Sequence, residues 1–230
     1  MTSMPTVPSR QLAASREGLT DRVYDAIVDF LLMGSLPVDT PIRIDQLARM
    51  LGVSATPVRE ALVRLESTGL VIRENFKGYR TGALLSAEEL QDLMAVRLLL
   101  EPEAAFQACQ KHNDTVLPAL QAAWEEQQST HASVGADGFL SFMRADQQFH
   151  RTINEGSGNR FLAVACSSVG GNVQRWRQFE DGVILDAADS LAEHKVILEA
   201  FRSGVPEAAR AAMVSHLERL SARMAHETQQ

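Results

Sequence analysis

Four side chains in the second half of the chain are of the types that hold a divalent metal ion. Asp146 and His150 are four residues apart, so on a helix they project from one face. His194 and His216 fall in two later segments with helical patterning. One carboxylate and three imidazoles suit Zn²⁺, Ni²⁺ or Mn²⁺ and leave room for water or a ligand's carboxylate. The alternative is that these histidines are ordinary core or surface residues, because the gap between positions 150 and 194 forms no local motif.

A second group of polar side chains, nearer the amino terminus, is of the types that contact DNA. The guanidinium of Arg59 can form two hydrogen bonds with guanine or with a phosphate, and the hydroxyls of Ser54 and Thr56 suit phosphates. The competing interpretation is a helix cap, a turn and solvated arginines. The full set of candidate DNA-contact residues is Arg43, Arg49, Ser54, Thr56, Arg59, Lys77 and Gly78.

Arg97 carries a charged side chain in a strongly apolar segment, so it needs a polar or oppositely charged partner there. Glu101, four residues later, can form an ion pair with it, worth about 0.3–0.5 kcal/mol if exposed. Arg175 and Arg177 flank Trp176 and either line a cavity or form a solvated surface.

The first elements are predicted from helix-breaking and capping residues. Residues 1–17 contain two prolines and no sustained period, which predicts a flexible lead-in. A first helix follows Thr20 as its cap and ends near Gly34. Two prolines then interrupt the chain, and a second helix covers about residues 45–51.

The third helix and the strands after it complete a small domain. Pro57 is expected at the first helical position after the cap Thr56. Short β-rich runs at 70–72 and 78–81 predict a two-stranded wing. A short turn between two short helices, followed by a wing, predicts a winged helix-turn-helix DNA-binding domain over residues 18–82.

The rest of the chain is patterned as helix almost throughout, with no strand signal. The fold class is therefore mostly α, with an all-helical domain over residues 86–228 as the expected effector-binding and dimerisation domain. Helix-breaking segments that contain glycine, asparagine or proline separate about six helices. The expected segments are 86–110, 114–133, 137–155, 158–180, 184–203 and 206–227.

Composition and charge restrict the class of protein. The 230 residues are 45% hydrophobic and 22% charged, as in a globular protein. Two cysteines form no disulfide framework, and neither a signal sequence nor a membrane-spanning run is apparent, so we expect a cytoplasmic protein. The net charge of −7 is uneven, because residues 1–81 hold 10 basic and 9 acidic residues. The acidic excess therefore lies outside the predicted DNA-binding domain.

The segment from Gly52 to Leu62, followed by Leu65 and Gly69-Leu70-Val71, closely resembles the winged-helix signature of the GntR superfamily of bacterial transcription regulators. The resemblance implies that Arg59 contacts DNA, with Ser54, Thr56 and the wing residue Gly78 beside it. This chain has Ala55 where family members often carry a basic residue, so the operator sequence does not transfer.

An all-helical domain after such a winged helix resembles the domain arrangement of the FadR-type branch, in which the effector domain is called FCD. Asp-x-x-x-His, Glu-His and a final His-Leu match the metal-binding subset of FCD domains. The resemblance implies that Asp146, His150, His194 and His216 are the metal ligands, with Zn²⁺ first among the candidate ions. It also implies that Arg97 binds the carboxylate of an organic acid. Six helices resemble the shorter, VanR-like type.

These expectations combine into a dimeric, ligand-responsive transcription regulator that binds a palindromic double-stranded DNA operator. A small carboxylate bound near the metal would change operator binding. Two alternatives remain: a metal-dependent enzyme acting on a small organic acid, and a metal site that only stabilises the fold.

Overall fold

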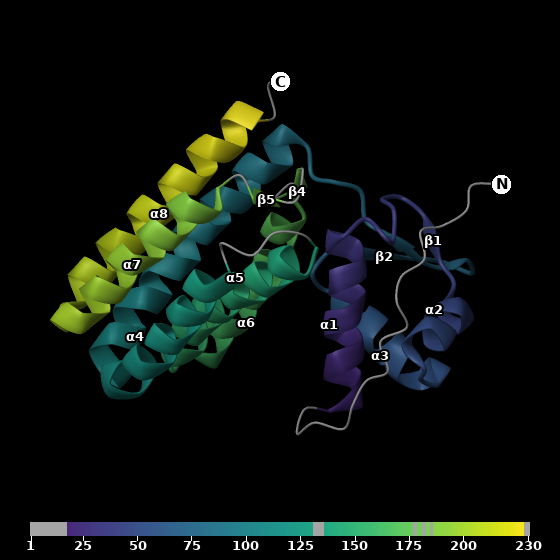
Figure 1. Ribbon diagram of the computed structural model, residues 1–230, viewed down its shortest axis with the longest axis horizontal. Helices are drawn as coiled ribbons and strands as arrows, with labels where there is room; N and C mark the ends of the chain where they lie inside the picture. Colours follow the sequence, from purple (N-terminus) through teal and green to yellow (C-terminus); the bar gives the residue numbers. More distant parts are fainter. Residues whose placement is uncertain (1–17, 131–135, 177–178, 181–182, 185, 228–230) are drawn as a thin grey trace. The chain divides into compact units, whose positions relative to one another are not determined.

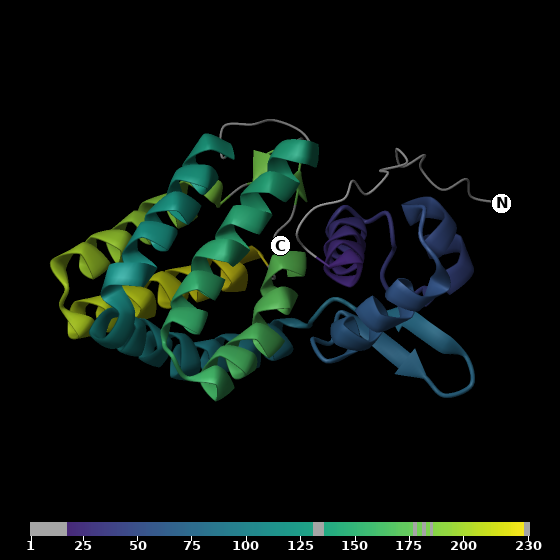
Figure 2. The same ribbon diagram turned by 90° about the horizontal axis from the view of Figure 1, so that it is seen from below.

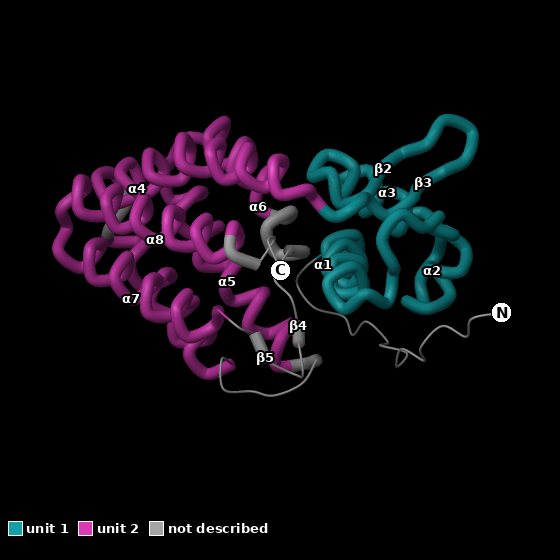
Figure 3. The backbone as a smooth tube through the Cα atoms, turned by 90° about the horizontal axis from the view of Figure 1, so that it is seen from above, with its two compact units in different colours: residues 1–84 teal, residues 85–230 magenta. Residues whose placement is uncertain are grey.

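The computed structural model describes residues 18–130, 136–176, 179–180, 183–184 and 186–227 (Figure 1). The predicted lead-in, 1–17, lies outside the described residues. The chain divides into two compact units, residues 1–84 and 85–230 (Figure 3). Within the part of the chain described, no helix is both long and apolar enough to cross a membrane.

The first unit packs three helices against a small antiparallel sheet with strand order β1-β3-β2. The prediction of a two-stranded wing was incomplete, because β1 pairs with β3 and adds a third strand. This strand has only two residues, too short to show an alternating pattern. The elements are α1 (Leu19–Leu32), β1 (Pro41–Ile42), α2 (Ile44–Leu51), α3 (Ala55–Glu66), β2 (Val71–Glu74) and β3 (Gly78–Thr81).

Two predicted helix starts were wrong by a few residues. Gly18 is the N-cap of α1, and the hydroxyl of Thr20 instead donates to Glu60 Oε2 on α3 at 2.7 Å. Helix α3 begins after Ser54, so Thr56 and Pro57 are its second and third residues. Proline is tolerated there because the N–H groups of the first helical turn have no partner within the helix.

The core of the first unit fixes how α2 and α3 meet. Val58 and Leu62 of α3 are fully buried, with Leu47 of α2 and Ile27 of α1 packed in the same cluster. Gly52 ends α2 with a φ of 68°, a left-handed conformation that glycine adopts without steric cost. The short turn after Gly52 therefore presents the start of α3 at the surface of this unit.

The second unit is helical, with one short hairpin (Figure 2). The described residues form five helices there where six were expected, because the first two predicted segments are one continuous helix. The hairpin of β4 and β5 was not predicted. The elements are α4 (Ala87–Thr130), α5 (Ala136–Gly156), α6 (Arg160–Trp176), β4 (Phe179–Glu180), β5 (Val183–Ile184), α7 (Ala187–Ser203) and α8 (Pro206–Glu227).

Helix α4 is 44 residues long, yet it folds back on itself. Gly156 of α5 lies against both Ala108 and Val116, which would be about 12 Å apart along a straight helix. The bend therefore lies near residues 113–114, where the sequence predicted a break. The hydrogen-bonding pattern stays helical through it, so the two arms count as one element.

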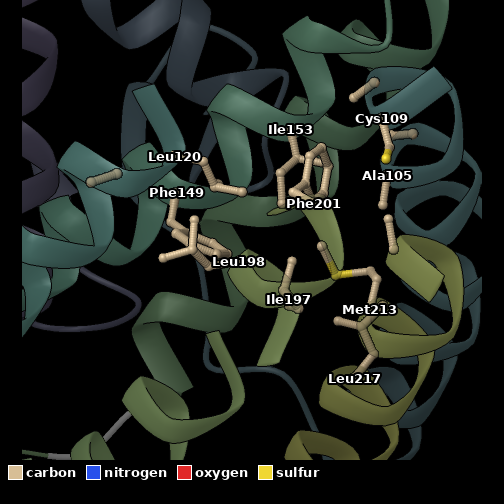
Figure 4. Close-up of a cluster of buried hydrophobic side chains, with 14 of the residues drawn as sticks. Ala105, Cys109, Leu120, Phe149, Ile153, Ile197, Leu198, Phe201, Met213 and Leu217 are labelled. Carbon is tan, nitrogen blue, oxygen red and sulfur yellow. The ribbon is translucent and has the colours of Figure 1, made fainter. Parts of the chain in front are cut away.

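The core of the second unit lies between these arms and the helices they face. Phe149 and Ile153 of α5, Leu198 and Phe201 of α7 and Leu217 of α8 are buried in one cluster (Figure 4). Their ring and aliphatic contacts fix the rotation of α5, α7 and α8 about their axes. The polar faces of the same helices are thereby brought together next to the core.

Candidate metal centre and DNA-contact surface

The three predicted histidine ligands come together from three helices. The candidate ligand atoms of His150 (α5), His194 (α7) and His216 (α8) all lie within 4.8 Å of one another. Their ring centroids are 4.8–5.2 Å apart. The fourth predicted ligand is adjacent, with Asp146 Oδ1 3.9 Å from His194 Nε2. The three imidazoles thus face a common point and can hold a divalent ion, and the Asp146 carboxylate lies beside one of them.

Each histidine is oriented by an oxygen acceptor on its other ring nitrogen. The Nδ1 atoms of His150, His194 and His216 lie 2.8, 2.7 and 2.9 Å from oxygens of Glu101, Gln127 and Glu193, respectively. An acceptor at Nδ1 favours the tautomer with its proton there, which leaves the Nε2 lone pair for a metal.

Nε2 of His216 provides a direct test of whether the residues fit a metal. The atom is buried and has no hydrogen-bond partner within the described residues. Leaving a buried polar atom unpaired costs about 1–3 kcal/mol, and a bound cation would satisfy it. Together with the donor set, this atom shows that the residues fit a divalent ion.

Two of the three oxygen acceptors, Glu101 and Glu193, form ion pairs with arginine side chains. Arg97 donates from Nε and Nη2 to the two oxygens of Glu101 at 2.5 and 3.2 Å. Arg223 donates to both oxygens of Glu193 at 2.7 and 3.1 Å. The Arg97–Glu101 pair expected at i,i+4 is present, but it is buried, with Arg97 4% exposed. Its effect is therefore to fix Glu101 against His150.

Burial and charge set the protonation states around the centre. Burial raises the pKa of Glu101, but Arg97 and then His150 outweigh it, and the pKa falls well below its usual range. Burial, followed by repulsion from His150 and Arg97, lowers the pKa of His216. A carboxylate and a neutral imidazole are the forms that a metal site requires. Burial and Glu101 raise the pKa of Cys166 to about 12, which keeps its thiol protonated.

Two further contacts connect the predicted ligands to the core and to each other. The Phe149 ring stacks on His194 with centroids 4.2 Å apart and planes at 5°. Asp146 also accepts a hydrogen bond from Gln127 Nε2 at 3.1 Å. Gln127 therefore bridges two predicted ligands, one through its oxygen and the other through its nitrogen.

A cavity of about 260 Å³ lies beside the centre. Arg97, Glu101, Asp146 and His150 line one side, and residues of α6, among them Cys166, line the other. A volume of this size fits a small organic molecule. The structure therefore places Arg97 both in the cavity wall and in its pair with Glu101. The side chains of Arg175 and Arg177 lie outside the described part of the chain.

All seven candidate DNA-contact residues are exposed on the first unit. Arg43 caps α2 and Arg49 lies in its last turn. Ser54, Thr56 and Arg59 lie at the start of α3, and Lys77 and Gly78 lie at the tip of the wing.

Phe76, which was not predicted, is also at the wing tip. Its side chain is fully exposed and its φ is 63°, in the left-handed region. The turn between the two predicted strands was visible in the sequence, but the exposure of one aromatic ring within it was not.

The acceptors Gln127 and Glu193 and the partner Arg223 were not predicted from the sequence. These residues lie 67, 23 and 30 positions from the groups they contact. Gln127 is a polar residue fully buried in a helix, and only the structure shows which group satisfies it.

Comparison with known proteins gives matches over most of the chain. Residues 19–81 match the bacterial regulatory proteins of the gntR family, and residues 92–219 match the FCD domain. A probable D-xylose utilization operon transcriptional repressor of Paenarthrobacter nicotinovorans is 30% identical over 208 residues, covering 88% of this chain and 87% of the relative.

Solved structures share the fold. Escherichia coli McbR/YncC has a TM-score of 0.73 at 20% identity, covering 92% of this chain and 99% of that one. A putative GntR transcriptional regulator from Rhodococcus sp. RHA1 has a TM-score of 0.67 at 22% identity, covering 89% and 96%. At these identities the likeness concerns the fold alone.

Proposed function

Because the chain belongs to the gntR family of DNA-binding transcription regulators and carries an FCD domain, we propose that its helical unit senses a small carboxylic acid through a divalent metal ion. The ion would be held by Asp146, His150, His194 and His216, with Zn²⁺ the first candidate. The bound ion would supply a positive charge and an open position for a ligand's carboxylate.

The observation that carries this proposal is the arrangement of the three imidazoles. Each has an oxygen acceptor at Nδ1, and the candidate ligand atoms of the three rings lie within 4.8 Å of one another. Satisfied core histidines need no such convergence. Outer acceptors of this kind fix the tautomer and raise the basicity of a metal-bound imidazole.

The charge of the cavity supports a metal-dependent anion site. The described residues that line it include two arginines, Arg97 and Arg151, and three carboxylates, Glu101, Asp146 and Glu155, which together give a formal charge of −1. A divalent ion changes this charge to +1. A carboxylate would be repelled by the metal-free cavity and attracted by the loaded one.

The contacts of Arg97 suggest a role other than direct binding of the effector's carboxylate, which was the first expectation. Its Nε and Nη2 already bind Glu101, so we propose that it acts through Glu101 on His150. Its remaining nitrogen, Nη1, donates a hydrogen bond to the Met94 sulfur at 3.9 Å. A direct contact with the effector's carboxylate would use that nitrogen.

On the first unit, we propose that the start of α3 enters the major groove of DNA. Arg59, with Ser54 and Thr56 beside it, would contact bases and phosphates there. Arg43 and Arg49 would contact the flanking backbone. Lys77 and Gly78, at the wing tip, would approach the minor groove.

A homodimer on a palindromic operator follows from the two-fold geometry that such sites require. The effector would act by binding one arrangement of the two winged helices more tightly than another. The Paenarthrobacter nicotinovorans relative is named as a repressor, which favours repression for this chain.

The matched families are regulators and not enzymes, which removes the metal-dependent enzyme as an interpretation. The purely structural metal site makes a different prediction from the sensor. It predicts that metal removal lowers stability while leaving the response to acids unchanged.

Metal content and DNA binding of the full chain test the proposal. We expect one divalent ion per chain by native mass spectrometry, and none in the double variant His194→Ala, His216→Ala. The matched control is Glu199→Ala with Glu207→Ala, two exposed residues of the same helices. Full metal content in the histidine variant would refute the ligand assignment.

The sensing step needs a second measurement. DNA selected from a random duplex library by the full chain supplies an operator probe for fluorescence anisotropy. We expect small carboxylic acids to shift its affinity with the Zn²⁺-loaded chain and not with the histidine variant. An equal shift in operator affinity for both proteins would overturn the metal-based sensor. A shift in neither protein would favour a metal site that only stabilises the fold.

A further inference from the structure

Phe76, at the tip of the wing, is a large apolar side chain directed into solvent. Its exposed fraction of 110% means that no described residue packs on the ring. The loop between β2 and β3, which carries it, projects beyond the other elements of the first unit (Figure 3). Single apolar residues are common on protein surfaces, so exposure alone assigns no function to this ring. Its backbone conformation and its charged neighbours are more informative.

The backbone of Phe76 has a conformation that disfavours phenylalanine. Lys77 N donates to Glu74 O at 3.2 Å, which closes a four-residue turn with Phe76 in its third position. The φ of Phe76 is 63°, in the left-handed region, where glycine or asparagine is usual at this point of a turn. Phenylalanine therefore costs free energy here and gains no contact with the described residues in return. A residue held in this way is a candidate for contact with a partner.

The charges around the ring suit a polyanion. Arg73 and Lys77 lie on either side of the turn and are exposed. Arg80 binds two carboxylates, Glu74 at 3.1 Å and Asp39 at 2.9 Å. These three cations outnumber the two carboxylates, so the wing keeps a net positive charge. An apolar ring between cations matches the minor groove of DNA, where phosphates lie on both sides of the base-pair edges.

The base of the wing is fixed, so the ring is carried on a firm support. Strands β2 and β3 pair from Val71–Thr81 to Glu74–Gly78. Val71 and Thr81 are buried, and Tyr79 packs against the core of the first unit. A ring presented on a paired hairpin loses less conformational entropy on binding than one on a flexible loop.

We propose that Phe76 inserts between two stacked base pairs from the minor groove and kinks the operator at that step. This inference rests on the proposed function, which brings the wing tip to the minor groove. Apolar side chains that unstack a step in this way bend the duplex toward the major groove. Pyrimidine–purine steps, TA and CA/TG, are the easiest to unstack. The operator therefore prefers such a step at the wing tip, although the ring forms no hydrogen bond with a base.

The fluorescence of 2-aminopurine tests the insertion directly, because this adenine analogue brightens when it is unstacked. The full chain is bound to an operator selected from a random duplex library, with the adenines of each flank replaced one at a time. We expect a position in each half-site to brighten with the wild type and not with Phe76→Asn. The same substitution should weaken binding about tenfold without lowering the melting temperature, because asparagine suits the turn.

Two control variants separate the ring from its surroundings. Lys77→Ala, beside the ring, should reduce the slope of log Kd against log salt concentration by about one, because one phosphate contact is lost. Phe76→Asn should leave that slope unchanged, since an inserted ring releases no counterion. Phe161→Asn makes the same change at an exposed ring of the second unit and should alter neither operator binding nor fluorescence.

The outcomes distinguish this inference from the function on which it rests. If Arg59→Ala binds the operator weakly but no flank position brightens, or Phe76→Asn keeps its Kd within about twofold of the wild type, the insertion is overturned alone. If Arg59→Ala, Lys77→Ala and Phe76→Asn all bind like the wild type, the proposed DNA-contact surface fails and the insertion with it. Weaker self-association of Phe76→Asn without DNA would also overturn the insertion, because the ring would then pack on a second copy of the chain.

Discussion

Glu193→Gln tests whether the outer carboxylates tune the metal centre. Glu193 is buried, accepts from His216 Nδ1 at 2.9 Å and binds Arg223 through both oxygens. The substitution keeps the shape and one acceptor oxygen but removes the charge. We expect weaker Zn²⁺ binding by the folded protein, because a neutral acceptor makes the His216 imidazole a poorer ligand.

The expected size of the effect follows from these contacts. A hydrogen bond to a charged group contributes about 1.5–3 kcal/mol, roughly twice a neutral one, so about 1–1.5 kcal/mol is lost at His216. Loss of an outer partner typically costs 10- to 100-fold in metal affinity. Arg223, 20% exposed, can turn to water and adds little. We therefore expect Kd to rise about 10-fold, at the lower end of that range.

Competition with a chromophoric chelator measures this Kd directly. Glu199→Gln is the matched control, because it makes the same change on the same helix at an exposed residue paired with Arg202. The ratio of the two Kd values should persist at high salt, since the Glu193 contacts are buried. A Kd within twofold of wild type, at an unchanged melting temperature, would refute the reasoning.

Three further changes test other parts of the molecule. Arg59→Ala should weaken binding to a selected operator by about 10-fold or more at an unchanged melting temperature, measured by anisotropy; normal binding would contradict the assignment of α3. The free energy of unfolding of the metal-free chain should fall as pH drops below about 6.5, because the buried imidazole of His216 resists the proton that the unfolded chain takes up. His216→Asn should flatten that slope in urea titrations by up to about 1.4 kcal/mol per pH unit, and an unchanged slope would exclude this group. A Cβ at Gly156 would overlap Val116 Cγ2, so Gly156→Ala should cost about 1–3 kcal/mol; Val116→Ala in the same chain should restore part of it, and strict additivity would argue against the contact.

The sequence was most informative where local chemistry determines local structure. Gly52 and the capping residues around Ser54 locate the turn between α2 and α3, because few residues tolerate the conformations needed there. The four-residue spacing of Asp146 and His150 likewise predicts one face of a helix. Such signals act over one or two helical turns and need no knowledge of the fold.

Long-range partners were outside the reach of the same reasoning. Nothing in a single sequence says that Gln127 orients His194, 67 residues away, or that Glu193 faces His216 rather than its neighbour. The short strand β1 escaped detection because two residues carry no period. Its formation depends on pairing with β3, which is a property of the folded unit.

The reversal of α4 has a consequence for how the protein folds. Glu101 and Gln127 lie on opposite arms of this helix, yet they contact histidine rings whose centroids are 5.1 Å apart. The candidate metal centre is therefore a structure of high contact order, completed only when both arms, α5, α7 and α8 have docked. Interactions that form after the folding transition state affect mainly the unfolding rate. Bound Zn²⁺ should accordingly prolong the lifetime of the native state while leaving the rate of folding almost unchanged.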